Sequence, residues 1–309
     1  MRRGGAHGLE IDTYTVRLRV EEAHAAVREA LEVMNRSVGL DDALGREAGA
    51  LELAVPARVL DLARSRGNRC SMDSSKVAVV VGVGPGLGGA VARRFAREGY
   101  AVALLARRLD SLRETHEKIH EAGGRALSLP VDATDAASVA DGFGEIREQL
   151  GDPEVLVYNA GAFKPGGILE ITPEEFESSW KANCMGGFLA ARAVVPAMLA
   201  RSSGTLILTG ATASRRGSAS YSCLSVGKFG LRALAQSLAR ELGPRGIHVA
   251  HAVIDGQIDM PGIRRRQPGR ATHTLLDPDS IARTYWEIHC QGPTAWTQEL
   301  DLRPAVEKF

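Results

Sequence analysis

The sequence has few cysteines, no marked excess of charge of either sign, and no long apolar run. Its four cysteines (Cys70, Cys184, Cys223 and Cys290) are far apart and form no C-x-x-C pair, which argues against a disulfide framework and a structural zinc site. The net charge of +1 gives no reason to expect a nucleic acid or an anionic membrane as a partner. No segment approaches the ~18 apolar residues of a membrane span, and no apolar stretch follows the basic N-terminus as in a signal peptide. These features predict a cytoplasmic protein without a metal site.

The chain is expected to divide near residue 72. Residues 1–71 are predicted to form a helical N-terminal extension, because apolar residues recur at helical spacing in VEEAHAAVREALEVM, from Val20 to Met34. A polar linker, RSRGNRCSMDSS, follows this stretch. Two interpretations of the extension stay open: an element that docks on the main domain or a second subunit, and a poorly folded appendage.

Residues 72–309 alternate between short apolar runs and helical patterns. KVAVVVG, residues 76–82, is typical of a strand buried on both faces. A long helix is expected from Thr172 towards Arg201, with a kink at Pro196. Further strands are predicted in YAVALLA, RALSLPVD, EVLVYNAG, GTLILTG, GIHVAHAVI and TQELDLRP. The alternation predicts an α/β fold, a Rossmann-like doubly wound parallel sheet of about seven strands flanked by helices.

The first predicted strand ends in a glycine-rich turn, VVVGVGPGLGGA. Gly82, Gly86 and Gly88, with Leu87 between the last two, allow a tight turn, close approach of the backbone to a pyrophosphate, and close packing of helix on strand. The helix that begins here offers free N–H groups to phosphates. The turn follows a strand and precedes a helix, which favours a dinucleotide-binding site over a purely structural turn.

The end of the second predicted strand indicates which dinucleotide binds. NAD sites usually place an acid about 20 residues after the glycines, where it binds the ribose 2′-hydroxyl. Here Ala106 stands near that place, followed by Arg107 and Arg108. A guanidinium group can hold a 2′-phosphate that an acid would repel, so NADP is favoured over NAD. The alternative is that both arginines are simply solvated.

Residues 76–309 resemble a short-chain dehydrogenase/reductase, beginning with GVGPGLG, which is similar to the family's G-x-x-x-G-x-G. The resemblance implies that Asp132 in PVDATD lies at the adenine pocket and that Ile258 in IDGQID touches the nicotinamide. IDGQID stands in place of P-G-x-x-x-T, and YNAG resembles N-N-A-G with Tyr158 replacing the first asparagine. The cofactor residues implied by this last motif are Asn159, Ala160 and Gly161.

The same resemblance implies catalytic roles for Asn183 in KANCMGGF and Lys228 in YSCLSVGK. In the family the lysine holds the cofactor ribose and lowers the pKa of a tyrosine four residues earlier, which acts as the general acid/base. That position is Leu224 here, and the position of the family's substrate-binding serine, thirteen residues before the tyrosine, is Ala211. Neither side chain can donate a proton. The chain is therefore identified as an atypical member that lacks the usual Tyr and Ser.

Three nearby side chains are candidates to replace the missing groups. Tyr221, three residues before Leu224, is either a displaced catalytic acid or a packing residue at the rim of the site. Cys223 is either a proton donor or a small buried hydrophobe. The hydroxyl of Thr212, next to Ala211, is expected to bond the backbone rather than substrate. Lys228 and Asn183 are also consistent with NADP binding without turnover.

The sequence thus predicts an NADP-dependent oxidoreductase with an altered acid/base site, which acts on a carbonyl or alcohol group of a small molecule. Two alternatives remain: an NADP-binding sensor or partner subunit without turnover, and an enzyme of non-redox chemistry with a structural cofactor. The segment after Ile258 takes the place of the substrate lid. Its arginines either attract an anionic substrate or are simply solvated: Arg264, Arg265, Arg266 and Arg270.

The helix KFGLRALAQSLAREL has apolar residues too widely spread for one buried face. Part of its surface is expected to meet the same helix of a second subunit, as in the family, which predicts a homodimer or homotetramer.

Overall fold

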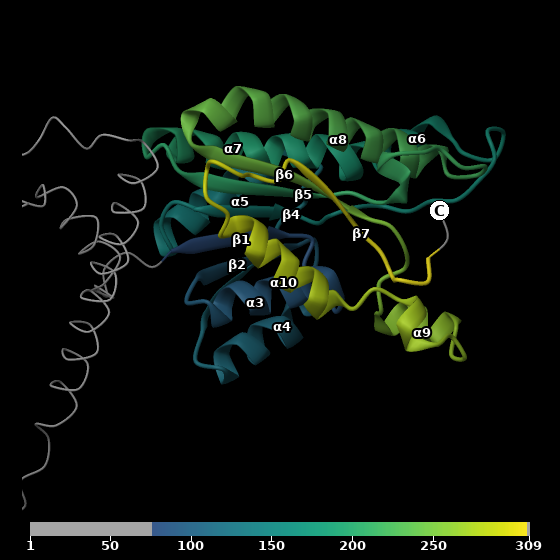
Figure 1. Ribbon diagram of the computed structural model, residues 1–309, viewed down its shortest axis with the longest axis horizontal. Coiled ribbons are helices and arrows are strands. Elements are labelled where there is room, and N and C mark those ends of the chain that lie inside the picture. Colours follow the sequence, from purple (N-terminus) through teal and green to yellow (C-terminus); the bar gives the residue numbers. More distant parts are fainter. Residues whose placement is uncertain (1–75, 308–309) are drawn as a thin grey trace, which may run out of the picture. The chain divides into compact units, whose positions relative to one another are not determined.

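Seven parallel strands form the centre of the computed structural model, which describes residues 76–307 (Figure 1). The strands are β1 (Val77–Val81), β2 (Ala101–Ala106), β3 (Arg125–Pro130), β4 (Val155–Tyr158), β5 (Gly204–Thr209), β6 (Ile247–Ile254) and β7 (Glu299–Leu302). Their order, β3-β2-β1-β4-β5-β6-β7, confirms the predicted doubly wound parallel sheet. The predicted N-terminal extension, with its helical stretch at 20–34, lies outside the described residues.

The central strands are apolar throughout because both faces of the sheet are covered. Every residue of β1, β4, β5 and β6 is buried. A parallel sheet with helices on both faces has this continuous apolar pattern rather than an alternating one. The strand order reverses between β1 and β4, so the crevice for a ligand is expected at the carboxyl ends of these two strands.

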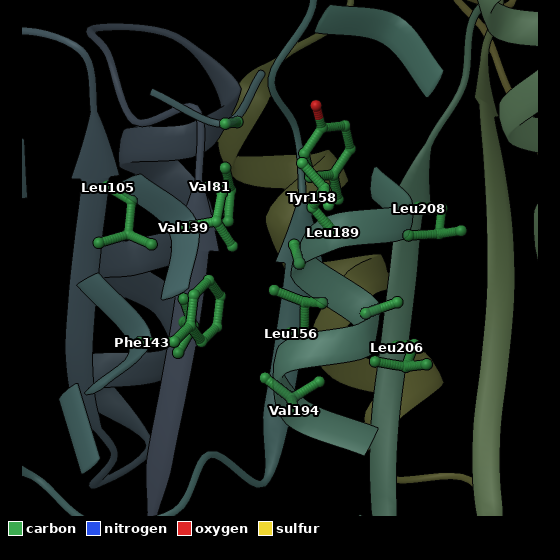
Figure 2. Packing of buried hydrophobic residues seen from close by; sticks show 14 of the residues in the cluster. Val81, Leu105, Val139, Phe143, Leu156, Tyr158, Leu189, Val194, Leu206 and Leu208 are labelled. Atoms are coloured by element: carbon green, nitrogen blue, oxygen red, sulfur yellow. The ribbon is translucent and has the colours of Figure 1, made fainter. Parts of the chain in front are cut away.

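Two hydrophobic clusters fill the space between the sheet and its helices. On one face pack α3 (Leu87–Arg97), α4 (Asp110–Glu121) and α10 (Pro278–His289). On the other face pack α5 (Ala136–Gln149), α7 (Gly186–Ala200) and α8 (Ser222–Leu242). Figure 2 shows part of the second cluster, with Phe143 of α5 and Leu189 and Val194 of α7 beside the strand residues Val81 and Leu156.

The long helix predicted from Thr172 is continuous but contains one irregular turn. It begins with α6 (Pro173–Trp180), passes through the π-helical turn η1 (Lys181–Met185) and continues as α7. The kink at Pro196 stays a prediction: α7 continues through Pro196, and the irregular turn, which was not predicted, lies earlier in the helix. Pro196 is exposed, so water can bond the helical carbonyl that the proline leaves unpaired.

The stretch Pro173–Ala200 is also long and apolar enough, by length and composition alone, to cross a membrane. The core helix of a globular domain meets the same criteria. Leu189, Val194 and Met198 of this stretch are buried in the hydrophobic cluster of Figure 2, which accounts for its apolar composition.

Candidate active site

A cleft of about 830 Å³ lies at the carboxyl ends of β1, β2 and β4, within the size range of ligand sites. It is lined by residues 81–84, 105–108, 111, 131–134, 159–162, 178 and 182. The cleft brings together six of the predicted cofactor residues: Gly82, Arg107, Asp132, Asn159, Ala160 and Gly161. The other predicted residues, which do not line it, are Gly86, Leu87, Gly88, Lys228 and Ile258.

Gly82 and Gly88 fix the backbone of the glycine-rich turn. Gly82 has a φ of +90°, and its N–H and that of Val83 both donate to Leu105 O at 2.8 and 3.0 Å. A side chain on Gly82 would overlap the backbone of Ala160, and one on Gly88 would overlap the Gly82 carbonyl. Gly82 is needed for its positive φ and for the close approach of the Ala160 backbone. Gly88 is needed for the close packing of α3 on β1.

The N-terminus of α3 is suited to binding an anion. The helix begins at Leu87, and its N-cap, Gly86, has no side chain to bond the first N–H groups. These groups and the helix dipole favour a phosphate. Met260, the residue before α9 (Pro261–Arg266), lies over this turn, and a Cβ on Gly86 would be 3.4 Å from its Cε. No pattern in the sequence indicated Met260.

Charged side chains stand at the end of the cleft beside β2 and β3. Arg107 and Arg108 follow β2 and are exposed. The Asp132 carboxylate accepts hydrogen bonds from Thr134 N at 2.9 Å and Thr134 Oγ1 at 2.8 Å. These bonds, the backbone one first, hold the pKa of Asp132 below its usual value, with a smaller contribution from the charge of Arg107. The sequence analysis missed Thr134, although an Asp followed two residues later by Thr is a common turn pattern.

The residues after β4 join the glycine-rich turn to the long helix. Asn159 Nδ2 donates to Gly82 O at 3.0 Å. Tyr158 is fully buried and its hydroxyl donates to Ala182 O at 2.7 Å, within the π-helical turn. A side chain on Gly186 would overlap this hydroxyl, so the glycine makes room for the tyrosine. Tyr158, in place of the family's asparagine, thus connects β4 to the turn that carries Asn183.

Asn183 and Lys228 meet at Gly161, on the wall of the cleft. Asn183 is buried, its Nδ2 donates to Ala162 O at 2.8 Å and Ser179 O at 2.9 Å, and its Oδ1 has no hydrogen-bond partner in the described part of the chain. Lys228 Nζ donates to Thr209 O at 2.8 Å, and burial lowers the pKa of this amine to about 8. A Cβ on Gly161 would lie 2.9 Å from Asn183 Oδ1 and 3.6 Å from Lys228 Nζ.

A buried histidine lies on the same side of the sheet as Lys228. His251 of β6 has no exposed surface, and neither ring nitrogen has a hydrogen-bond partner among residues 76–307. Burial, and to a lesser extent the positive charge of Lys228, lowers the pKa of His251 to about 4. The imidazole is therefore neutral near pH 7. His251 was not predicted from the sequence, because a histidine within an apolar strand carries no distinctive pattern.

Neither Ala211 nor Leu224 supplies a proton donor. Ala211 follows β5, and its N–H donates to Ser214 Oγ at 3.1 Å. Leu224 is half-buried on α8, four residues before Lys228. Cys223 is buried, as expected for a small hydrophobe.

Tyr221 stands at the rim rather than within the helix. It is the N-cap of α8, with φ of −119° and ψ of 18°, and its side chain is 40% exposed. Its ring packs against Phe163, with 5.3 Å between the ring centroids. The sequence analysis missed Phe163, which follows the Y-N-A-G segment by two residues.

Two expectations about neighbouring loops need correction. Thr212 Oγ1 donates to the Asp255 carboxylate and not to the backbone, because a charged acceptor lies within reach. In the lid segment, Arg264 pairs with Asp259, and Arg270 bonds side chains of that segment, so two of the four arginines stabilise the loop itself. Arg265 and Arg266 are exposed. Across residues 76–307, no group of three or more His, Cys, Asp or Glu is placed to hold a metal ion.

Residues 76–266 match the family description "short chain dehydrogenase". Glycine betaine reductase ATRR of Emericella nidulans is 32% identical over 220 residues, which are 68% of this chain, although the chain spans only 17% of that protein's length. The uncharacterized oxidoreductase YxjF of Bacillus subtilis is 32% identical over 206 residues, 67% of this chain and 80% of that protein.

Solved structures show the same similarity. A short-chain dehydrogenase from Rhodopseudomonas palustris is 36% identical, with a TM-score of 0.63 over 74% of this chain and 98% of that one. A metagenomic short-chain oxidoreductase in complex with NADP is 28% identical, with a TM-score of 0.65 over 76% of this chain and 99% of that one. The family match over residues 76–266 includes β1 to β6 and every residue that lines the cleft.

Proposed function

Because the chain belongs to the short-chain dehydrogenase family, we propose that it is an NADP-dependent oxidoreductase acting on a carbonyl or alcohol group of a small molecule, with an altered acid/base site. The observation that carries this proposal is the single cleft that connects the glycine-rich turn, Arg107 and Asp132 to the Asn183–Lys228 pair at Gly161. When bound, the nicotinamide supplies or accepts a hydride.

The residues around the cleft fit such a cofactor. The N–H groups at Gly86, Leu87 and Gly88 would hold the diphosphate, since no side chain caps them. Arg107 would hold the 2′-phosphate and Asp132 the adenosine end, as their places beside β2 and β3 suggest. The remaining proposed cofactor residues, toward the nicotinamide end, are Asn159, Ala160, Gly161, Lys228 and Ile258. The solved NADP complex of a family member supports a nicotinamide cofactor, and the preference for NADP rests on Arg107 and the absence of an acid at Ala106.

Lys228 is the group that we assign to proton transfer. With a pKa of about 8 it carries a proton at neutral pH yet gives it up more readily than an ordinary lysine. Its ammonium lies by Gly161, beside the unpaired Oδ1 of Asn183. Tyr221 is the second candidate for this role, and its exposed place at the rim favours Lys228.

The alternative function is NADP binding without turnover, as a sensor or partner subunit. Ala211 and Leu224 favour it, because both positions lack the groups that activate a carbonyl. The decisive experiment titrates NADPH and NADH by cofactor fluorescence and then follows NADPH consumption with aldehydes, ketones and quinones. Consumption supports the oxidoreductase, tight binding without consumption supports the alternative, and no binding of either cofactor contradicts both.

We also propose a cytoplasmic homodimer or homotetramer with no nucleic-acid or membrane partner. Supporting residues are four large apolar side chains on adjacent helices, each more than a third exposed: Trp180, Phe188, Val226 and Phe229. Such a patch is usually covered in a soluble protein. Light scattering at micromolar concentration should show a dimer or larger, and Phe229→Glu should shift it toward the monomer. A monomer in the unmodified protein would contradict the assembly.

A further inference from the structure

Two loops bring a pair of aromatic rings together, and one of these loops also carries the cleft residues Gly161 and Ala162. Phe163 lies in the loop after β4, and Tyr221 precedes α8. Their ring centroids are 5.3 Å apart at an interplanar angle of 45°, and the side chains are 57% and 40% exposed. A hydrogen bond of 2.9 Å from Gly166 N to Ser220 O joins the same two loops. The rings are therefore held in place by the backbone and still present apolar surface to a ligand.

The path from these rings leads to Lys228. Leu224 and Lys228 are four residues apart and share one side of α8, and Tyr221 is the N-cap that precedes them. Ser225 N donates to Tyr221 O at 2.9 Å, which fixes Tyr221 to the first turn. Phe163 is two residues from Gly161, which borders Lys228 Nζ. Both rings thus belong to the two segments that carry Gly161 and Lys228.

The side chains that precede Lys228 in these two segments are mostly apolar. Phe163 and Tyr221 expose aromatic rings and Leu224 is apolar and half-buried, whereas Lys228, further along α8, is a buried amine. A sugar or other hydroxylated compound would lose hydrogen bonds to water against these side chains. A flat conjugated ring would keep contact with Phe163 and Tyr221 through stacking or edge-to-face packing, while its carbonyl oxygen faces the positive charge.

We propose that Phe163 and Tyr221 form a ring-binding site that selects planar aromatic or conjugated carbonyl compounds. The assignment of these compounds as substrates rests on the proposed function. Binding of the ring is a separate property and is measured without turnover.

The test compares two ketones of similar size, 1-tetralone with an aromatic ring and 1-decalone without one, by isothermal titration calorimetry in the presence of NADP. The unmodified protein should bind 1-tetralone about tenfold more tightly, the size of one to two aromatic contacts. Phe163→Ala and Tyr221→Ala should each remove most of this preference. Tyr221→Phe, which keeps the ring, should reduce it much less than Tyr221→Ala.

Leu169→Ala is the matched control, because Leu169 lies in the same loop as Phe163, is also apolar and is 97% exposed. It should leave both affinities unchanged, and thermal unfolding should show that all variants are folded. Equal binding of the two ketones by the unmodified protein, or a preference that survives both alanine variants, would overturn the ring site. A titration with NADPH alone tests the proposed function separately. If NADPH does not bind, the proposed function is contradicted, whereas the relative affinities of the two ketones still test the ring site.

Discussion

The proposed cofactor-binding region, around β1, β2 and β4, and the proposed catalytic region, around β5 and α8, differ in how closely they follow the family pattern. Around β1, β2 and β4, a residue that departs from the family pattern makes a new contact. Tyr158, which replaces an asparagine of the family motif, bonds Ala182 O of the long helix. Around β5 and α8, Ala211 and Leu224 have no side chain that could donate a proton, and the nearby Thr212 hydroxyl bonds Asp255 instead. Cofactor binding depends largely on backbone shape, whereas proton transfer depends on single functional groups. The two properties can therefore be altered independently in one fold.

The strongest way to sharpen this contrast is to remove the amine. Lys228→Met should lower turnover at saturating NADPH by about 10²- to 10⁴-fold, because positioned proton transfer contributes that much. Steady-state kinetics measure the loss, and Arg240→Met, a change on the exposed part of the same helix, is the control. Turnover within threefold of the unmodified protein would exclude Lys228 as the proton donor.

Arg107→Asp should break the cofactor end selectively. A carboxylate would repel the 2′-phosphate and accept the 2′-hydroxyl of NAD, so the ratio of NADP(H) to NAD(H) affinity should fall by about 10²-fold. Fluorescence titration with NADPH and NADH measures it, with Arg97→Asp, on an exposed arginine of α3, as control. A preference for NAD(H) in the unmodified protein would refute the role of Arg107.

The pH dependence of the reaction rate should report the protonation of Lys228. Because the pKa of Lys228 is about 8, carbonyl reduction should be nearly constant from pH 6 to 8 and fall about tenfold per unit above it. Alcohol oxidation needs the neutral amine, so its rate should rise from pH 6 to 8 and level off above pH 8. The nearest titratable neighbours keep their charge between pH 6 and 8, because burial raises the pKa of Cys184 and lowers that of His251 to about 4. Initial rates in both directions check this, and profiles without a break near pH 8 would contradict it.

Restoring the family's tyrosine and serine should bring the catalytic region closer to the family pattern. Leu224→Tyr combined with Ala211→Ser should raise the reduction of simple ketones about tenfold, a fraction of what a well-placed acid gives. Leu224→Phe with Ala211→Ser is the control, since it adds the ring without the hydroxyl. An equal gain in both double variants would show that the ring, not the proton donor, is responsible.

The smallest change concerns the Tyr221 hydroxyl. Tyr221→Phe keeps the contact with Phe163 and should lower kcat by no more than about twofold, because the amine remains the proton donor. A loss as large as that of Lys228→Met, at saturating substrate, would instead identify Tyr221 as the displaced acid.

The fold and the cofactor end were predictable because their signals are local. The apolar runs of β1, β4 and β5 reflect burial on both faces of a parallel sheet, and the glycines follow from the turn they build. NADP specificity and the site residues remain predictions, since they depend on a ligand's contacts.

The remaining features depend on contacts between distant residues. The low pKa of Lys228 arises from burial that α8 acquires only when it packs on the sheet. Thr212 bonds Asp255 because two strand ends lie side by side, 43 residues apart in sequence. The π-helical turn also depends on a distant contact, because it lies where the Tyr158 hydroxyl of β4 bonds Ala182 O of the long helix.

The π-helical turn also sets the rotational phase of the long helix. Phe176 and Trp180 are four residues apart and share a face of α6, whereas Phe188 follows Trp180 by eight residues, about 80° out of phase in a regular α-helix. The wide turn at Lys181–Met185 takes up one extra residue, so Phe188 returns to the stripe at nearly two whole turns. Deleting one residue there would restore regular helix and leave Phe188 on the face of Trp180, seven residues or about 700° further on, so the wide turn accommodates an additional residue without rotating the side chains that follow.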